Sequence, residues 1–136
     1  MPLTLNEDQE MLRDSAAGFL AEEAPVSEFR KLRDSGSEDG FSRELWAKMA
    51  AMGWSGILVP EEFGGADFGM VGAGVVAEEM GKQLTATPYL STAIMAATAL
   101  NTLGSQAQKE QHLPRIAAGE ELFAIAHDER GKHSAL

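Results

Sequence analysis

Glu61 and Glu62, in the stretch VPEEFGG at residues 59–65, are the first residues whose types could carry chemistry. Two carboxylates can act as an acid and a base, but neighbours in sequence do not face each other across a cleft. A phosphate-binding loop of the Walker type needs a lysine after its glycines, and Asp67 follows them here. Proline, two acids and two glycines between apolar segments are typical of a turn, which we therefore predict.

Two further stretches match catalytic or cofactor motifs only formally. GAGVVA at residues 72–77 has the glycine spacing of a dinucleotide fingerprint, but that motif needs a preceding strand and an acid about 20 residues later. Neither is evident, so we interpret these small residues as helix-packing positions. GWSG at residues 53–56 lacks one residue of a nucleophile elbow, and Ser55 is interpreted as a turn serine.

The histidine and carboxylate cluster is the remaining candidate for metal chemistry. Its members are His127, Asp128, Glu129 and His133. They fall on a predicted strand end and in the C-terminal segment, not on a rigid frame with converging ligands, so we predict no metal site. His112 lies among glutamines and lysines and is predicted to be a surface residue. The chain has no cysteine, which excludes disulfides, zinc–thiolate sites and thiol catalysis.

Composition limits the possible partners. The chain has 136 residues, which fits one domain, and its 44% hydrophobic content is ordinary for a globular protein. The net charge of −10 disfavours binding to nucleic acid or anionic membranes. The first residues are acidic and polar, unlike a secretory signal. The longest weakly polar run, residues 88–100, is too short to span a bilayer, so a cytoplasmic protein is expected.

Four segments in the first half are predicted from local patterns. Asn6 and Gln9 form a capping box that begins a helix, and Pro25 ends it. Residues 27–40 are polar and end in DSGSEDG, so we predict a loop. Ser42 is the expected N-cap of a second helix that ends at Gly53. The stretch WSGILVP at residues 54–60 is predicted to be extended.

Three helices and one strand are predicted in the second half. One helix begins near Asp67 or Phe68 and runs to residue 82. Another, over residues 89–103, is apolar nearly all round and is expected at the centre of a bundle. A last helix starts at Ser105, and Pro114 should bend or split it. Residues 122–127 are predicted to form a strand, which has no partner in this sequence and would not be stable alone.

These elements predict an all-α domain of five to six helices over residues 1–120. Residues 121–136 would then hold the first strand and the start of a truncated β domain. The unpaired strand is the reason to expect that the fold continues beyond Leu136. No internal repeat is visible.

The segment MGWSGILVPEEFGGADFG, residues 52–69, resembles the acyl-CoA dehydrogenase family. That family has a short helix, Gly-Trp, an apolar link and then Pro-Glu-x-x-Gly-Gly. LTLNEDQEMLRDSAAGFL resembles the family's first helix, and VVAEEMGKQL its glutamate-rich third helix. LGSQAQKEQHLPRIAAGEELFAIAHDE resembles the segment that leads into the middle β domain. The resemblance covers essentially the whole chain, and TPYLST and AHDER are most similar to bacterial pimeloyl-CoA dehydrogenase small-subunit-like members.

The resemblance implies an FAD-dependent enzyme that oxidises an acyl-CoA thioester to its 2-enoyl form. In the family a glutamate base removes the α proton while the β hydrogen passes to flavin N5 as hydride. An electron-transfer flavoprotein then takes the electrons, and members form homo- or hetero-oligomers. The family fold places a helical domain before a middle β domain and a C-terminal helical bundle. The base and most flavin contacts would lie beyond Leu136, so no catalytic residue is assigned in this chain.

The resemblance also assigns two groups of site residues. The positions that would line the flavin ring are Ile125, His127 and Asp128. Asp128 stands where many members have threonine or glycine, so this sequence departs from the pattern there. The positions that would wall the acyl-chain cavity are Leu90, Ser91, Ile94 and Met95. Core packing is the alternative explanation for these four, because apolar helices are normally buried.

Three functional hypotheses follow. The chain is the N-terminal domain of an acyl-CoA dehydrogenase, or a natural short helical assembly module that needs a partner subunit to complete a flavin site. A third possibility is the corresponding domain of a sister flavoenzyme such as an acyl-CoA oxidase. Under the first two hypotheses, the isolated 136-residue chain should be inactive and hold little or no FAD.

Overall fold

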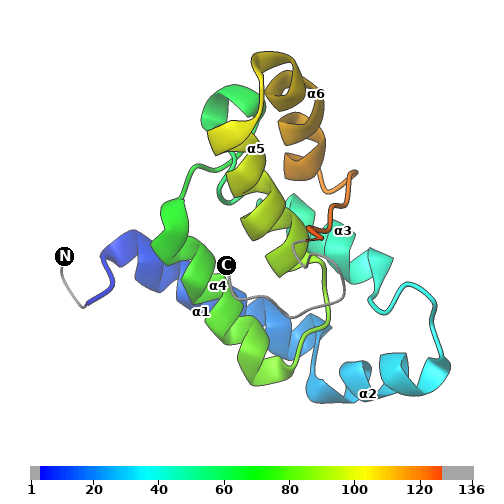
Figure 1. Ribbon diagram of the computed structural model, residues 1–136. Helices are drawn as coiled ribbons and strands as arrows, with labels where there is room; N and C mark the ends of the chain where they lie inside the picture. The colour runs from blue at the N-terminus through cyan, green and yellow to red at the C-terminus, as the bar shows by residue number, and fades with distance from the viewer. Residues whose placement is uncertain (1–3, 127–136) are drawn as a thin grey trace.

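The computed structural model describes residues 4–126, and over that range the regular secondary structure is helical, as predicted (Figure 1). The α-helices are α1 (Glu7–Glu23), α2 (Val26–Ser35), α3 (Arg43–Ala51), α4 (Gly69–Gln83), α5 (Ala97–Leu103) and α6 (Gln106–Ala117). A short 3₁₀ helix, η1 (Glu61–Phe63), precedes α4, and a π-helix, η2 (Tyr89–Ala96), leads directly into α5.

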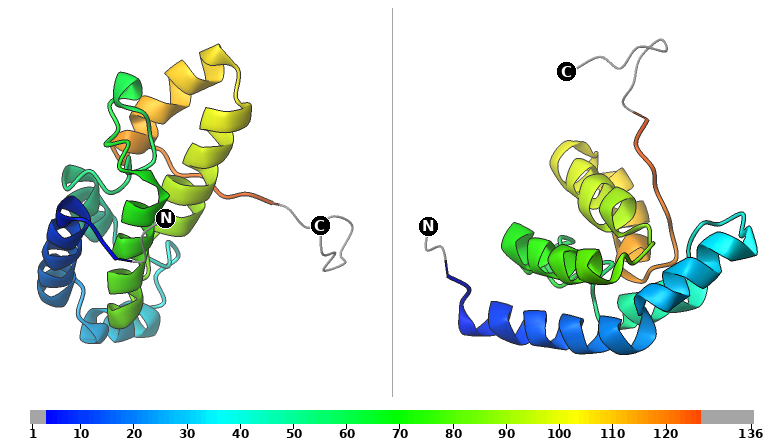
Figure 2. Two further views of the ribbon diagram at one scale, coloured as in Figure 1. Left: turned by 90° about the vertical axis from the view of Figure 1, so that its left-hand side faces the viewer. Right: turned by 90° about the horizontal axis from the view of Figure 1, so that it is seen from below.

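Helix α1 begins at the predicted capping box. The Gln9 amide donates to Asn6 Oδ1 at 2.8 Å, and the Asn6 amide donates to Gln9 Oε1 at 3.1 Å. This reciprocal pair satisfies two amide groups that the first turn leaves without helical partners. Ala16 and Leu20 are buried on the face that packs against α4, and the two helices lie side by side (Figure 2).

Helix α2 corrects the predicted loop at residues 27–40. Pro25 precedes the first helical residue, and Gly36 ends the helix in the left-handed region at φ 67°. The apolar residues Val26, Phe29 and Leu32 recur at helical spacing, but the charged residues around them hide that stripe in the sequence. No α2 residue is buried, and the helix lies at the edge of the molecule (Figure 1).

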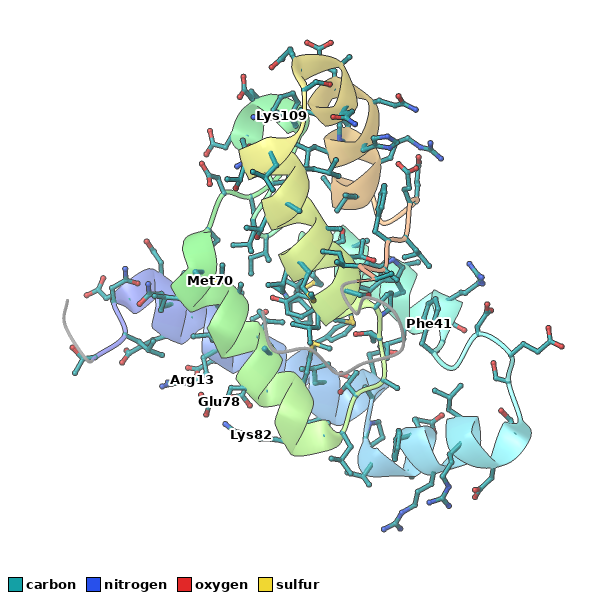
Figure 3. The ribbon with its side chains drawn as sticks, in the orientation of Figure 1. Arg13, Phe41, Met70, Glu78, Lys82 and Lys109 are labelled. Atoms are coloured by element: carbon teal, nitrogen blue, oxygen red, sulfur yellow. The ribbon has the colours of Figure 1, made fainter. Side chains whose placement is uncertain are left out.

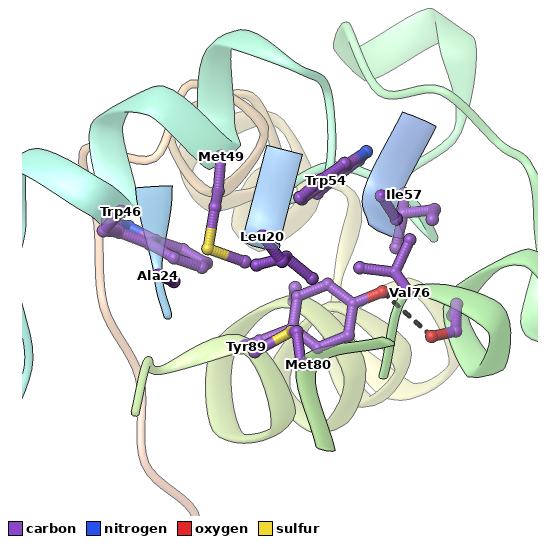
Figure 4. Close-up of a cluster of buried hydrophobic side chains, with 12 residues drawn as sticks. Leu20, Ala24, Trp46, Met49, Trp54, Ile57, Val76, Met80 and Tyr89 are labelled. Atoms are coloured by element: carbon purple, nitrogen blue, oxygen red, sulfur yellow. Dashed lines mark hydrogen bonds between the residues drawn. The ribbon is translucent and has the colours of Figure 1, made fainter. Parts of the chain in front are cut away.

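The main core lies among α1, α3, α4 and η2 (Figure 4). Leu20, Met49, Trp54 and Tyr89 are among its largest buried side chains. Burying one such side chain contributes about 1.5–3 kcal/mol before losses of conformational entropy. A second, smaller cluster consists of Val59, Ala97, Leu113 and Ile116. These two clusters position η2 and α5 against the rest of the domain.

The predicted extended link at residues 54–60 is instead folded into turns. The Val59 amide donates to the Gly56 carbonyl at 3.0 Å, and the Ile57 amide donates to the Trp54 carbonyl at 3.4 Å. Trp54, Ile57 and Val59 are all buried. The apolar run therefore reflects burial of a compact turn, a pattern that cannot be distinguished from a buried strand by composition.

The helix predicted over residues 89–103 is present, but it is not buried all round. Its first half is wound as a π-helix, and one of its faces is open to solvent. Leu90 is 66% exposed and Leu103 is 84% exposed, whereas Tyr89, Thr92 and Ala93 on the inner face are buried. The exposed side of an apolar helix is a surface that needs an explanation.

Two predictions near the end of the described chain are also corrected. Helix α6 is continuous through Pro114, so the predicted split is absent, while the predicted bend stays a prediction. Pro114 lies in the last turn, where only the bond to the carbonyl of Glu110 is lost. Residues 120–126 form no strand, because no partner strand exists in the described part of the chain. The domain boundary at residues 120 and 121 stays a prediction.

Candidate functional site

An apolar groove lies on the exposed face of η2 and α5, with a cavity volume of about 450 Å³. Met70, at the beginning of α4 (Figure 3), forms one side, and Ile125 in the C-terminal segment also lines it. The other lining residues are Ile94, Met95, Thr98, Ala99, Thr102 and Leu103. The groove thus brings together Ile94, Met95 and Ile125, which the resemblance assigned to the acyl-chain and flavin sites.

Two other assigned residues, Leu90 and Ser91, lie outside this groove. Leu90 lines a neighbouring cavity of about 300 Å³, which also contains Ile94 and Tyr89. Ser91 is half-buried and donates its hydroxyl to the Pro88 carbonyl at 3.2 Å, which places it outside both cavities. His127 and Asp128 lie outside the described residues.

Thr92 determines where Ile125 lies. The Thr92 hydroxyl accepts a hydrogen bond from the Phe123 amide at 3.0 Å and donates one to the Phe123 carbonyl at 3.1 Å. Thr92 is fully buried, so these bonds form in a low-dielectric environment where a lost partner is costly. The ring of Phe123 also packs edge-to-face on His112, with ring centroids 5.4 Å apart. Residues 121–126 are therefore held on η2.

Tyr89 is the first residue of η2 and fixes that end of it. Its hydroxyl donates to the Ala73 carbonyl of α4 at 3.1 Å (Figure 4). Burial raises the pKa of Tyr89 well above its ordinary value, so the phenol stays neutral and remains a donor. This contact joins η2 to α4 and so maintains the wall of the groove.

Two contacts anchor the end of α6. The Ser55 hydroxyl donates to the Ala117 carbonyl at 2.7 Å, and the Trp46 indole donates to the Gly119 carbonyl at 3.1 Å. Ser55 is buried in the turn after α3, which agrees with its interpretation as a structural residue. His112, predicted to be a surface residue, is half-buried, and its Nδ1 lies 3.0 Å from Glu121 Oε2.

The stretch VPEEFGG is a turn, as predicted. Glu61 and Glu62 are exposed in η1, and Gly64 ends it in the left-handed region at φ 80°. The Gly65 amide donates back to the Pro60 carbonyl at 3.2 Å and closes the turn. Neither glutamate faces the apolar groove, whose lining contains no carboxylate.

Replacing Glu61 and Glu62 together with alanine should leave both folding and activity almost unchanged. Exposed side chains without special contacts usually change stability by less than about 0.5 kcal/mol. Urea denaturation of the variant, with turnover measured on the complete protein, checks this expectation. A well-folded variant whose turnover collapses would show that these carboxylates do carry chemistry.

One buried charged residue has a structural contact. Glu79 on α4 is buried, and its carboxylate accepts a hydrogen bond from Lys82 at 2.6 Å. Arg13 of α1 lies near this end of α4 (Figure 3). Within residues 4–126 no three metal-ligating side chains lie together. Within the same residues, none of the helices combines the length and the hydrophobicity that a membrane span requires.

Sequence reasoning missed Met70 and Thr92. Met70 reaches the groove only because α4 packs beside η2, and Thr92 acts on a segment 31 residues away. Neither of these contacts between distant parts of the chain leaves a local pattern in the sequence. The one available signal was a threonine inside an otherwise apolar helix, because a buried hydroxyl needs a partner.

A comparison with protein families matches residues 6–120 to the acyl-CoA dehydrogenase N-terminal domain. Acryloyl-CoA reductase (NADH) of Anaerotignum propionicum is 37% identical over 93% of this chain and 31% of its own length. Bovine mitochondrial isovaleryl-CoA dehydrogenase is 32% identical over 92% of this chain and 29% of its own. The chain therefore spans about a third of the length of such relatives.

Solved structures give the same result. The chain superimposes on one from the ChsE4–ChsE5 complex of Mycobacterium tuberculosis with a TM-score of 0.85 and 29% identity. That match covers 97% of this chain and 36% of the other. An acyl-CoA dehydrogenase complexed with FAD from Bacillus anthracis matches with a TM-score of 0.77 and 25% identity, over 97% of this chain and 22% of the other.

Proposed function

The chain belongs to the acyl-CoA dehydrogenase family as an N-terminal domain, and on that premise we propose that it walls the acyl-chain and flavin cavity of an FAD-dependent acyl-CoA dehydrogenase. The single observation that carries the proposal is the apolar groove. Three of its lining residues, Ile94, Met95 and Ile125, are residues that the resemblance of the sequence to this family assigned to the acyl-chain and flavin sites. An exposed apolar surface of this kind is typical of a binding site.

The side chains that line the groove fit an acyl chain and the apolar edge of a flavin ring. Its lining is almost entirely hydrocarbon and thioether, with two threonines and no charged group. Ile94 and Met95 would contact the acyl group, and Ile125 would lie nearest the flavin. FAD, when bound, supplies the acceptor for the hydride that leaves the β carbon.

The chain's own contribution to the reaction is positioning and exclusion of water. Apolar side chains on η2 and α5 would remove water from around the reacting carbons, which strengthens nearby electrostatic interactions. Thr92 holds residues 121–126 on η2, so Ile125 keeps a fixed place in that wall. Since no carboxylate lines the groove, the base that removes the α proton would come from another part of the protein.

The partners are also proposals. An acyl-CoA would be the substrate, and an electron-transfer flavoprotein would accept the electrons. A similar chain occurs in a structure described as the electron transferring flavoprotein of Acidaminococcus fermentans, with a TM-score of 0.72 and 27% identity. Homo- or hetero-oligomers are expected, and the match to a chain of the ChsE4–ChsE5 complex supports the hetero-oligomer in particular. That match favours a second candidate function, a helical module that completes a partner's flavin site.

Purification of the complete natural protein tests the proposal and separates the candidates. We expect a yellow protein whose bound FAD is reduced anaerobically by an acyl-CoA. If the activity needs a second, separately encoded subunit, the assembly module is supported. A complete protein, with any copurifying subunit, that neither binds FAD nor reacts with an acyl-CoA would overturn both.

A further inference from the structure

The segment after α6 leads from that helix to the apolar groove, and we propose that Glu121, near its start, is a positioning residue for the flavin-side wall of the site. This inference rests on the proposed function, which places Ile125 in that wall. Two side chains of α6 hold the Glu121 carboxylate, and the direction in which the chain leaves this contact determines where Ile125 lies.

Every second residue of this segment contacts the rest of the domain. Glu121 lies against α6, Phe123 bonds to η2, and Ile125 lines the groove. Glu121 and Phe123 are half-buried, whereas the residue that follows each of them is exposed. A period of two is the pattern in which extended backbone presents its side chains. The segment therefore has one inward side, on which Glu121 makes the first contact and Ile125 the last within the described residues.

The Glu121 carboxylate lies near two nitrogen donors of α6. Its Oε2 lies 3.0 Å from His112 Nδ1, and its Oε1 lies 3.6 Å from Arg115 Nη1. An Nδ1–H group donates to a carboxylate whether the ring is neutral or charged, and the guanidinium adds an opposite charge. The side chains of His112 and Glu121 are 22% and 21% exposed, so their contact is largely shielded from water. Shielding makes it stronger than an ion pair on the open surface.

His112 joins this contact to the one that Thr92 makes. Its ring packs edge-to-face on Phe123, with ring centroids 5.4 Å apart. The amide and carbonyl of Phe123 are the groups that bond to the Thr92 hydroxyl. Because Thr92 belongs to η2 and His112 to α6, two separate elements hold the segment. Contacts at two points fix the direction of a chain, whereas a single contact leaves it free to pivot.

The backbone at the end of α6 gives Glu121 a firm base. The Glu121 amide donates to the Arg115 carbonyl at 3.3 Å, and Gly119 turns the chain in the left-handed region at φ 73°. A Cβ atom added at Gly119 would lie 2.5 Å from the Cβ atom of Ala50, so this turn is packed closely against α3. The chain thus leaves α6 at a fixed point, and the Glu121 side chain sets its direction from there.

Glu121 acts through Ile125 and not by touching the reactants. The lining of the groove contains no carboxylate, and the proposed function places Ile125 nearest the flavin. When the segment pivots away, Ile125 leaves the wall and water enters beside the flavin ring. Protein groups around a flavin tune its electronic properties, so the bound cofactor reports where the segment lies.

Removing the carboxylate tests the proposal in the complete, flavin-loaded protein. We expect Glu121→Ala to speed amide hydrogen exchange at Phe123 by about tenfold, the effect of losing one hydrogen bond to a charged group. At saturating FAD the visible absorption spectrum of the flavin should shift. Its reduction in single turnovers, by the acyl-CoA that reduces the unmodified protein fastest, should slow by about tenfold. Glu121→Gln keeps an acceptor for His112 and should restore most of these properties.

Glu110→Ala is the matched control, because it removes an exposed carboxylate of α6 that bonds to Gln106 within the same helix. It should leave the hydrogen exchange, the flavin spectrum and the reduction rate unchanged. His112→Phe keeps a ring against Phe123 but removes the donor. In that background Glu121→Ala should change the hydrogen exchange by less than about threefold, because the two residues act as a pair.

Unchanged protection of Phe123 in Glu121→Ala would overturn the inference. So would a full effect of Glu121→Ala in the His112→Phe background, because the carboxylate would then act without its partner. Faster exchange with an unchanged flavin spectrum and reduction rate would also overturn it, since Glu121 would then hold the segment without positioning the wall. An unmodified protein whose FAD no acyl-CoA reduces would instead overturn the proposed function.

Discussion

Gly65→Ala is expected to destabilise the domain by about 3 kcal/mol or more, the largest effect of any substitution considered. A Cβ atom at residue 65 would overlap the backbone carbonyl of Val59, which is itself buried in the second core cluster. Backbone cannot move aside as a flexible side chain can. The turn would have to open, and the amides of residues 65 and 67 would lose their bonds to the Pro60 and Val59 carbonyls.

Urea denaturation followed by tryptophan fluorescence measures this effect, because Trp46 and Trp54 are buried in the main core and report unfolding of the whole domain. Gly74→Ala is the matched control. It makes the same chemical change inside α4, where the new methyl group meets nothing within 4 Å. The free energy of unfolding of that variant should rise by about 0.5–1 kcal/mol, because alanine favours helix more than glycine does. Equal stability of the two variants would contradict the account of the turn.

Thr92→Val should lower the free energy of unfolding by about 1–3 kcal/mol and release the segment that carries Ile125. Valine keeps the shape of threonine but leaves the Phe123 amide and carbonyl without their partner. Because this contact holds residues 121–126 on η2, its loss should affect the groove more than the core. In the complete protein we expect FAD affinity to fall about tenfold, the equivalent of about 1.4 kcal/mol.

Amide hydrogen exchange at Phe123 is the most direct readout of Thr92→Val, because protection reports local opening. Thr98→Val is the control, since Thr98 is exposed on α5 and lines the groove without a hydrogen bond to the C-terminal segment. It should leave the protection of Phe123 unchanged. Full protection of the Phe123 amide in Thr92→Val would show that something other than the hydroxyl holds this segment.

Local signals predicted much of the fold. The capping box at Asn6 and the serine at position 105 predicted two helix starts, and the structure shows a capping box at each, formed by residues only three positions apart. Helix α2 was missed because its apolar stripe has only three members among many charged residues. None of its residues is buried, so the helix lacks the broad apolar face by which a packed helix is recognised in a sequence. The turns at residues 54–60 were missed because a buried turn and a buried strand have the same apolar composition.

The π-helical winding of η2 could not be predicted in the same way. Tyr89 donates to α4 and Thr92 binds Phe123, so partners distant in sequence hold the inner face of η2. The site shows the same limit. Family resemblance indicated Ile94, Met95 and Ile125, whereas Met70 joins them only through the packing of α4 beside η2. Side chains that meet across helices leave no pattern in a single sequence.

The reaction of bound flavin with acyl-CoA tests the central claim most directly. The complete natural protein, with any subunit that copurifies, would be mixed anaerobically with a series of acyl-CoA thioesters while the flavin absorbance is recorded. The account predicts bound FAD that is bleached by at least one thioester, with a rate that depends on acyl length. A protein without flavin, or with flavin that no acyl-CoA reduces, would contradict the claim that this domain walls an acyl-CoA dehydrogenase site.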